Sequence, residues 1–492
     1  MKQAALHKKG ERSIKTALLL TIALAAASQA LGSKISPIFG SEQRKLLAKL
    51  LAKQRGYTRA RTAYNGPERP NQLRNNTSPF PFPPKTDKVK IFPEPGNEMF
   101  YWIFKAKKNP AKAPVVIWLQ GGPGCASSGG LFTEIGPYYL KNYNKTNLDE
   151  RLISWNDQAN LLFVDQPLGV GLSTVTDGHV VKDFSEVGDQ FLTFYEGFLR
   201  QNPEYKGRPI FVTGESYGGH WIPYTALALY EAQNPDINLA GISIGNGYLD
   251  ALSDYATLAD FSYKYRNYTY ITEEMTVHYR AVGALCGHMF LVRPYNRMYT
   301  YNTLDICASV ENGIISHAME FNKDFDQYYM PSDKPGNGSA GVFLNRPEVQ
   351  AYLNVSTTFY SCNNTFEEYF LRVDNFVDSR EMIIKLLHSG IKVQIYDGAL
   401  DFICNYMMEE HSLATMDWVG VNEWNKRQLV DCKYGLCKQV RNLRYIRFAG
   451  AGHMVPNFNQ PLALEMMNEF FDWGLGSSGG DSEEEWLKGG RE

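Results

Sequence analysis

The feature that most constrains the fold is a serine set between glycines directly after a run of apolar, β-branched residues. The segment reads Arg208-Pro-Ile-Phe-Val-Thr-Gly-Glu-Ser-Tyr-Gly-Gly-His220 and contains the pattern G-x-S-x-G. This pattern predicts a strand that ends at Gly214, a sharp turn, and a helix that starts near Gly219. Ser216 is therefore the candidate nucleophile, although the pentapeptide alone also occurs in ordinary glycine turns.

Two further strand-like segments are followed by residues that complete a triad. Residues 391–396 precede a loop with Asp397 and Asp401, and residues 443–448 precede the loop with His453. Serine, aspartate and histidine in this order, each just past the carboxyl end of a predicted strand, are typical of an α/β-hydrolase. Spacing alone leaves Asp397 and Asp401 both open as the carboxylate.

The three residue types act together because a serine hydroxyl is a weak nucleophile on its own. An imidazole has to take its proton, and a buried carboxylate has to orient the imidazole and stabilise the imidazolium that forms. We therefore assign Ser216 as nucleophile and His453 as general base and then general acid. The sequence contains no metal-type Cys/His spacing and no nucleic-acid motif, so we expect no metal, no organic cofactor and no nucleic-acid partner.

The remaining pattern predicts a mostly parallel central sheet with helices on both faces. Continuous apolar runs that should form doubly covered strands lie at 115–119, 160–164, 210–213 and 239–244. Residues 189–199 should form an amphipathic crossover helix. Between about 250 and 345 the strand rhythm gives way to Tyr-, Met- and charge-rich helical pieces. We expect these pieces to form an inserted helical cap over the pocket.

The chain resembles the serine carboxypeptidase family in an ordered series of motifs between about residues 90 and 470. The matching segments are Trp118-Leu-Gln-Gly-Gly-Pro-Gly-Cys125, Glu134-Ile-Gly-Pro137, Ser154-Trp-Asn156, Phe163-Val-Asp-Gln-Pro167, Gly214-Glu-Ser-Tyr-Gly-Gly-His220, Ile244-Gly-Asn-Gly247, Asn345-Arg-Pro-Glu-Val349, Asp401-Phe-Ile-Cys-Asn405 and Gly452-His-Met454. The resemblance implies a serine-type carboxypeptidase that releases C-terminal residues from peptides or proteins through an acyl-enzyme. It also implies that Asp401 is the catalytic aspartate.

The resemblance implies further site residues around the triad. The oxyanion hole should consist of the backbone N–H groups of Gly122 and Tyr217. The site for the substrate's terminal carboxylate should consist of Gln120, Gly121, Glu134 and Glu215. The S1′ pocket should be bordered by Gly129, Thr133 and Met454. Position 120 is glutamine where the family commonly has asparagine, which keeps both amide donors on a longer stem.

Two glutamates can bind an anion only if they share a proton. Carboxyl groups in contact do not both stay ionised, so one pKa rises and the retained proton becomes a hydrogen-bond donor. We therefore expect peptide binding to be favoured at acidic pH. Two other functions stay open: an acyltransferase that passes the acyl group to an alcohol, and a noncatalytic protective or scaffold protein.

The two ends of the chain differ in composition from its body. Residues 1–30 are expected to be a signal peptide, because basic residues precede an apolar run at 16–27 and small residues at 28–30. Twelve apolar residues are fewer than the approximately 20 that cross a bilayer, so the mature form should have no stable membrane span. A signal anchor is the alternative.

Residues 31–80 are expected to be a basic pro-region or N-terminal extension. Residues 1–61 hold 13 Lys or Arg and 2 Asp or Glu, a net charge of +11, so the remainder carries −13 of the total of −2. A solvated helix or a membrane-surface helix are the alternatives. The catalytic domain should span 81–475, and an acidic, Gly/Ser-rich tail should span 476–492.

Cysteines and glycosylation signals predict passage through the secretory pathway, to the outside or to a vacuole- or lysosome-like compartment. The resemblance implies a Cys125–Cys362 disulfide, proximity along the chain suggests Cys286–Cys307 and Cys432–Cys437, and Cys404 is then a free thiol. Glycosylation sequons begin at Asn75, Asn76, Asn144, Asn267, Asn337, Asn354 and Asn363. The oligomeric state is left open.

Overall fold

The structure is a computed structural model that describes residues 79–80, 84–91, 96–140, 148–176, 178–291, 297–331, 340–366, 370, 377–476 and 486, with only the backbone described at 288–291 and 297–305. The expected signal peptide, most of the expected pro-region and most of the tail lie outside these residues. So do the sequons at Asn75, Asn76, Asn144 and Asn337. The fold described below belongs to the unit that spans 78–492.

A ten-stranded sheet forms the centre of the described part of the chain, in the order β1-β2-β6-β3-β7-β8-β9-β12-β11-β10. Its strands are β1 (Lys85–Lys90), β2 (Glu98–Phe104), β3 (Val115–Leu119), β6 (Asn160–Val164), β7 (Pro209–Ser216), β8 (Asn238–Gly247), β9 (Lys392–Gly398), β10 (Val430–Cys432), β11 (Gly435–Val440) and β12 (Leu443–Phe448). Strands β6 to β12 in this order are parallel, and both edges are antiparallel. Every residue of β3 and β6 is buried, as parallel strands covered on both faces require.

The strand that carries the candidate nucleophile is longer than the sequence pattern predicts. Strand β7 continues past Gly214 to Ser216, because its ladder with β8 continues through Glu215↔Gly245 and Ser216↔Gly247. Helix α5 (Gly218–Glu231) then begins one residue earlier than expected. The sharp turn is therefore confined to Ser216 and Tyr217.

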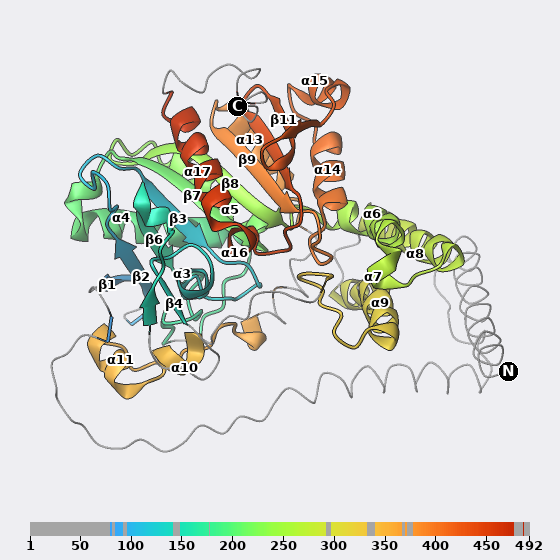
Figure 1. The fold of residues 1–492 in the computed structure, drawn as a ribbon. Coiled ribbons are helices and arrows are strands. Elements are labelled where there is room, and N and C mark those ends of the chain that lie inside the picture. Colours follow the sequence, from blue (N-terminus) through green and yellow to red (C-terminus); the bar gives the residue numbers. More distant parts are fainter. Residues whose placement is uncertain are drawn as a thin grey trace. The chain divides into compact units, whose positions relative to one another are not determined.

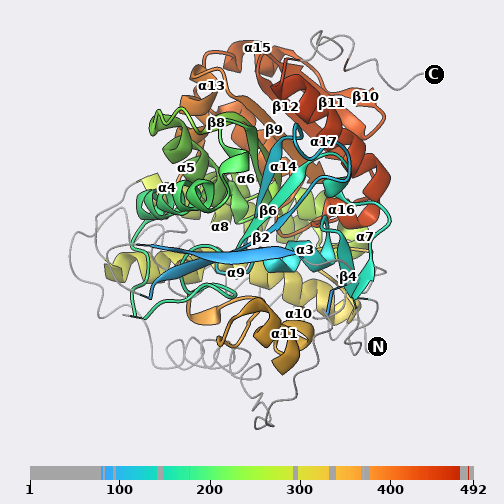
Figure 2. The same ribbon diagram turned by 90° about the vertical axis from the view of Figure 1, so that its left-hand side faces the viewer.

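Helices cover both faces of the sheet. Figure 2 shows α4 and α5 with α13 on one side of the sheet and α3 and α17 on the other. The helices around the sheet are α3 (Ser128–Thr133), α4 (Phe184–Gln201), α5, α13 (Arg380–His388), α14 (Tyr406–Thr415), α15 (Val421–Lys426), α16 (Val455–Phe458) and α17 (Gln460–Gly474), with short 3₁₀ turns at Trp155–Asp157 and Pro203–Tyr205. Helix α4 starts before the predicted 189 because the Asp183 side chain caps it by accepting the Glu186 N–H at 2.9 Å. Strands β4 (Tyr138–Leu140) and β5 (Leu148–Glu150) form a separate antiparallel pair.

A second group of helices lies between β8 and β9 in the chain. These are α6 (Ala251–Lys264), α7 (Arg266–Thr269), α8 (Glu273–Leu291) and α9 (Arg297–Phe321), followed by the short α10 (Ala340–Leu344) and α11 (Pro347–Leu353). Figure 1 shows α6 to α9 gathered next to α14. They have an apolar core of their own that also includes Phe402, the residue after Asp401. No helix within the described ranges is both long and apolar enough to cross a membrane.

Candidate active site

Ser216 occupies the turn between strand β7 and helix α5. Its φ is 61°, in the left-handed region that residues with a side chain rarely adopt. The sheet holds this conformation, because Ser216 pairs with Gly247 and its carbonyl accepts the Tyr248 N–H at 2.9 Å. The turn therefore places the Ser216 side chain at the carboxyl edge of the parallel strands.

The glycine-rich loop after β3 lies directly against this turn. A Cβ at Gly121 would lie 2.5 Å from the Tyr217 nitrogen and 2.7 Å from Ser216 Cβ, so no other residue fits at position 121. Gly122, which follows, is exposed, and Tyr217 is buried. The two backbone groups expected to form the oxyanion hole thus belong to adjoining segments.

His453 and Asp401 form a hydrogen-bonded pair. His453 Nδ1 lies 2.7 Å from Asp401 Oδ2, and the side chains are 4% and 0% exposed. Asp401 follows β9 and His453 follows β12, which are parallel neighbours in the sheet. Because parallel strands end at the same edge, the sheet brings together two loops that are 52 residues apart in the chain.

Asn246, at the end of β8, connects this pair to the strand of the nucleophile. Its Nδ2 donates to Asp401 Oδ2 at 2.9 Å, and its Oδ1 accepts the Gly398 N–H at 3.0 Å. The next residue, Gly247, pairs with Ser216. Asn246 belongs to the motif Ile244-Gly-Asn-Gly247, for which no role was expected. An amide side chain between glycines at the end of an apolar run is the signal that could have identified it.

Hydrogen-bond donors around Asp401 counteract part of the cost of burying its charge. Besides His453 and Asn246, the carboxylate accepts the N–H groups of Ile403 and Cys404 at 3.1 and 3.3 Å. Burial raises the pKa of Asp401, and the charge and hydrogen bond of His453, followed by the two N–H groups, oppose this rise. A carboxylate with these donors can stabilise an imidazolium.

Asp397, the other aspartate that spacing left open, lies elsewhere. It is inside strand β9 and fully buried, and its Oδ2 accepts the Tyr445 hydroxyl at 2.9 Å. Of the two aspartates, the one hydrogen-bonded to His453 is Asp401.

A segment after helix α9 holds the two loops of the aspartate and the histidine in place. The Gln327 carbonyl accepts the N–H groups of Phe402 and Ile403 at 3.0 and 3.1 Å, and the Tyr328 carbonyl accepts the His453 N–H at 2.8 Å. The Tyr328 ring packs on the imidazole with centroids 5.2 Å apart and is 40% exposed. This segment could not be predicted from sequence, because its hydrogen bonds are made by backbone groups that carry no sequence pattern.

Gln120, Glu134 and Glu215 interact beside the nucleophile. Gln120 Nε2 donates to Glu215 Oε1 at 2.7 Å, and Gln120 Oε1 accepts the Trp118 indole N–H at 2.9 Å, which fixes the orientation of the amide. Glu134 and Glu215 are 1% and 2% exposed. Glu215 precedes Ser216 in the chain, so this polar cluster lies next to the turn.

The two glutamates favour a shared proton. Burial raises the pKa of Glu134 to about 6, against hydrogen bonds and nearby positive charge. Burial, with the neighbouring charge of Glu134, raises the pKa of Glu215 well above its ordinary value. Within the described residues, the Oε2 atom of each glutamate has no hydrogen-bond partner. Both glutamates therefore tend to hold protons at acidic pH, and the pKa of Glu215 is raised further than that of Glu134.

The residues expected to border the S1′ pocket come from two elements. Gly129 and Thr133 lie on α3, which ends at Thr133, one residue before Glu134, and Met454 follows His453. The Thr133 hydroxyl donates to the Gly129 carbonyl at 2.9 Å. A Cβ at Gly129 would meet no atom within 4 Å, so glycine leaves open space at this position.

The structure contains the disulfides Cys125–Cys362, Cys286–Cys307 and Cys432–Cys437, the same pairs that the sequence analysis expects. Cys404 is a buried free thiol. Burial, followed by the charge of Asp401, raises the pKa of the Cys404 thiol well above its ordinary value. The thiol therefore stays protonated and is a poor nucleophile.

Three of the expected sequons lie within the described residues. Asn267 and Asn354 are exposed, whereas Asn363 is partly buried. The Asn363 side chain donates to the Gly169 carbonyl at 3.1 Å and accepts the Thr365 N–H at 3.2 Å. The structure thus presents Asn267 and Asn354 more openly than Asn363.

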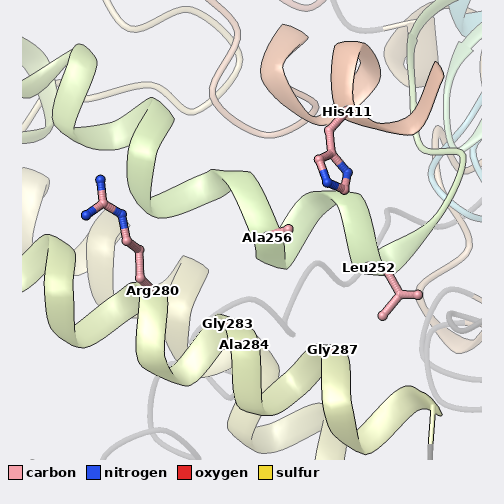
Figure 3. Close-up of a pocket in the computed structure, with 7 residues that line it drawn as sticks. All are labelled: Leu252, Ala256, Arg280, Gly283, Ala284, Gly287 and His411. Atoms are coloured by element: carbon pink, nitrogen blue, oxygen red, sulfur yellow. The ribbon is translucent and has the colours of Figure 1, made fainter. Parts of the chain in front are cut away.

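A cavity of about 480 Å³ lies between helices α6, α8 and α14 and includes none of the triad residues (Figure 3). Its lining residues are Leu252, Ala256, Arg280, Gly283, Ala284, Gly287 and His411. The two polar ones are already bonded: Arg280 Nε donates to Asp260 at 2.8 Å, and His411 Nδ1 contacts the Ser253 hydroxyl at 3.0 Å. In the ranges that the structure describes, no three His, Cys, Asp or Glu side chains are grouped to hold a metal ion.

The topology and the placement of Ser216, Asp401 and His453 define an α/β-hydrolase, and comparisons with known proteins refine this class. The sequence profile of the serine carboxypeptidase family matches residues 74–473. The chain is 30% identical to the pheromone-processing carboxypeptidase kex1 of Aspergillus fumigatus over 431 residues, which are 80% of this chain and 66% of that protein. It is 30% identical to the carboxypeptidase Y homolog A of Aspergillus oryzae over 394 residues, 76% of this chain and 72% of that protein.

A solved structure supports the fold. The crystal structure of Kex1(delta)p, a prohormone-processing carboxypeptidase from Saccharomyces cerevisiae, matches with a TM-score of 0.66 at 21% identity, over 79% of this chain and 91% of that chain. This chain belongs to the serine carboxypeptidase family. It spans 66% of the length of the kex1 relative from Aspergillus fumigatus.

Proposed function

We propose that this protein is a serine-type carboxypeptidase that removes residues from the C-termini of peptides or proteins. The observation that carries this proposal is the position of the Gln120–Glu215–Glu134 cluster, which adjoins Ser216 in the chain. A general esterase does not need a proton-sharing pair of buried glutamates beside its nucleophile. A carboxypeptidase has to recognise a terminal carboxylate, and a glutamate pair that retains a proton can donate a hydrogen bond to that anion.

In the proposed reaction, Ser216 Oγ attacks the carbonyl carbon of the last peptide bond while His453 takes the hydroxyl proton. Asp401 holds the imidazole through Nδ1 and stabilises its positive charge. The N–H groups of Gly122 and Tyr217 receive the oxyanion. His453 then protonates the departing amine, the C–N bond breaks, and an acyl-enzyme on Ser216 remains. A water molecule, deprotonated by His453, hydrolyses this ester and restores the serine.

The carboxylate of the substrate fits the proposed cluster for a physical reason. An amide N–H of Gln120 and the proton held by Glu215 can both donate to an anion. Removal of the shared proton places three negative groups together. Binding is therefore expected at acidic pH and is lost as the pH rises.

The surroundings of the site support two further proposals. Helices α6 to α9 act as a cap that shapes substrate choice, because their apolar core continues into Phe402 beside Asp401. The protein travels through the secretory pathway, to the outside or to a vacuole- or lysosome-like compartment. Three disulfides support this route, because disulfides persist in oxidising compartments.

Replacement of the nucleophile tests the proposal. Ser216→Ala should lower kcat for an N-blocked dipeptide by roughly 10⁴-fold or more with the fold intact by circular dichroism. Ser309→Ala, on the exposed surface of α9, is the matched control and should retain full activity. A Ser216→Ala enzyme with most of its activity would exclude the proposal. Transfer of most acyl groups to an added alcohol instead of water would show an acyltransferase.

A further inference from the structure

Arg151 is a buried cation that the proposed reaction does not use. It follows strand β5 and is only 6% exposed. Buried guanidinium groups are costly unless their N–H groups find acceptors. Arg151 Nε donates to the Gly136 carbonyl at 3.0 Å, and Nη2 donates to the Phe132 carbonyl at 3.0 Å. Both acceptors belong to the short stretch of chain that carries Glu134.

This stretch is the end of helix α3. Glu134 is the C-terminal cap residue of α3, and its N–H donates to the Gly130 carbonyl at 3.0 Å. The last carbonyl groups of a helix have no partner within the helix and carry partial negative charge, so a cation is favourable there. Arg151 bonds carbonyls two residues before and two residues after Glu134 and thereby fixes the turn on which this glutamate sits.

Arg151 also acts on Glu134 by its charge. Its guanidinium donates to carbonyls, and Glu134 Oε2 has no hydrogen-bond partner within the described residues, so the charge acts through space. Burial raises the pKa of Glu134, and the contact with Glu215, the charge of His453, the Gln120 amide and then the charge of Arg151 oppose this rise. In turn, burial lowers the pKa of Arg151 to about 10, and the charge of Glu134 opposes this change.

We propose that Arg151 is a positioning residue of the carboxylate site, which fixes the turn of Glu134 and directs the shared proton onto Glu215. The shared proton then lies on the glutamate that contacts Gln120 and adjoins Ser216. The two donors for the substrate carboxylate, the Gln120 amide and the Glu215 proton, are thereby placed next to each other. This inference rests on the proposed carboxypeptidase function.

Two substitutions separate the charge of Arg151 from its geometry. Arg151→Gln removes the charge but keeps an amide that can bond a carbonyl, and Arg151→Lys keeps the charge but loses the planar fork. KM and kcat are measured from pH 4 to 8 for an N-blocked dipeptide with a free C-terminus and for its C-terminal amide. Arg208→Gln is the matched control, because Arg208 also donates to carbonyls, of Pro110 and Ala113.

In the Arg151→Gln enzyme, the pH at which KM for the free acid begins to rise should move upward, because both glutamates then hold protons more tightly. Its KM at pH 4 to 5 should increase roughly 3- to 10-fold, because a favourable cation is lost from the anion site. In the Arg151→Lys enzyme, the pH at which KM for the free acid begins to rise should stay at the wild-type value, and only KM itself should increase. The kcat for the amide and both curves of Arg208→Gln should stay unchanged.

The results separate this inference from the function on which it rests. Wild-type enzyme that shows no preference for the free acid over the amide, at any pH, would overturn the carboxypeptidase proposal itself. With that preference present, an Arg151→Gln curve that keeps the wild-type pH position would overturn the role of Arg151. Equal losses of kcat/KM for the free acid and the amide in both variants would also overturn the role of Arg151, since they would indicate only a structural role. If the Arg151→Gln enzyme does not fold, the Arg151→Lys enzyme decides alone, through the comparison of its KM with the pH at which KM begins to rise.

Discussion

Two buried carboxyl sites flank the nucleophile, and they differ in the number of donors around them. Asp401 accepts hydrogen bonds from His453, Asn246 and two backbone N–H groups. The Glu134–Glu215 pair receives one side-chain donor, from Gln120, and each glutamate keeps one oxygen without a partner in the described residues. Burial raises the pKa in both places, but only the first site has the donors that stabilise a full charge.

Under the proposed function, this difference would let one fold use carboxyl groups for two purposes. Where donors converge, a carboxylate keeps its charge and can stabilise an imidazolium. Where two carboxyl groups converge, they keep a proton and can donate it to an anion.

Replacement of the ionised carboxyl should have the largest effect. Asp401→Asn removes the charge that stabilises the imidazolium and places an amide against His453 Nδ1, so kcat should fall by roughly 10³- to 10⁴-fold with little change in KM. The matched control is Asp397→Asn, which makes the same change four positions earlier at a residue bonded to Tyr445. It should stay within roughly 3-fold of wild type, because it removes no triad contact. Steady-state kinetics near pH 5 measure both, and similar losses in both variants would contradict the contrast.

Replacement of the proton-holding carboxyl should change the pH dependence more than the rate. In wild type, KM for a free-acid peptide should rise with pH by roughly 10-fold per unit above the upper pKa of the pair, because binding requires the shared proton. Glu215→Gln keeps a neutral donor at every pH, so this rise should be much smaller. KM from pH 4 to 8 is the measurement, and the amide substrate is the control. A variant curve as steep as that of wild type would show that Glu215 does not hold the proton.

The two sites also differ in how much of each the sequence could predict. Ser216 and His453 follow from strand pattern and chain order, because the residues that end neighbouring parallel strands meet at one edge. Asp401 needed the family resemblance, because spacing does not reveal that Asp397 points to Tyr445 from inside β9. The end of β7 was misplaced by two residues, since the ladder with β8 extends it.

The supporting residues could not be predicted in this way. Asn246 reaches Asp401 across 155 positions of the chain, and Tyr328 holds His453 through a backbone carbonyl. Arg151 acts on the surroundings of Glu134 through carbonyl groups that any residue would provide. Sequence patterns report which side chains carry chemistry. They do not report which backbone groups hold those side chains in place.

The Tyr328 ring tests whether packing also supports the ionised site. Aromatic contacts of this kind contribute about 0.5–1.5 kcal/mol, which corresponds to roughly 2- to 12-fold in rate. Tyr328→Ala should therefore lower kcat by that factor, and Tyr328→Phe should restore it, because the ring that packs on His453 returns. A rise in KM alone, with kcat unchanged, would indicate that the ring contacts substrate and does not support the imidazole.

Another buried carboxyl, that of Glu409 on α14, should affect stability and leave activity almost unchanged. It is fully buried, and neither of its oxygens has a hydrogen-bond partner among the described residues. Burial, followed by the charges of Asp397 and Asp250, raises the pKa of Glu409 well above its ordinary value, and Arg380 opposes this rise. A carboxyl whose pKa is raised by folding contributes stability at low pH and loses it as the pH rises through the folded-state pKa. The wild-type Tm should therefore fall between pH 5 and 8.

Glu409→Gln removes this titration, so its Tm should exceed that of wild type by roughly 2–5 °C at pH 8, with little or no gain at pH 5. Calorimetry at both pH values measures the difference, and Glu231→Gln, at an exposed position on α5, is the control that should follow wild type. Parallel Tm curves for the Glu409→Gln and wild-type proteins would mean that Glu409 finds a compensating partner as the pH rises. A buried carboxyl without hydrogen-bond partners would then retain its proton only where a second carboxyl shares that proton, as in the Glu134–Glu215 pair.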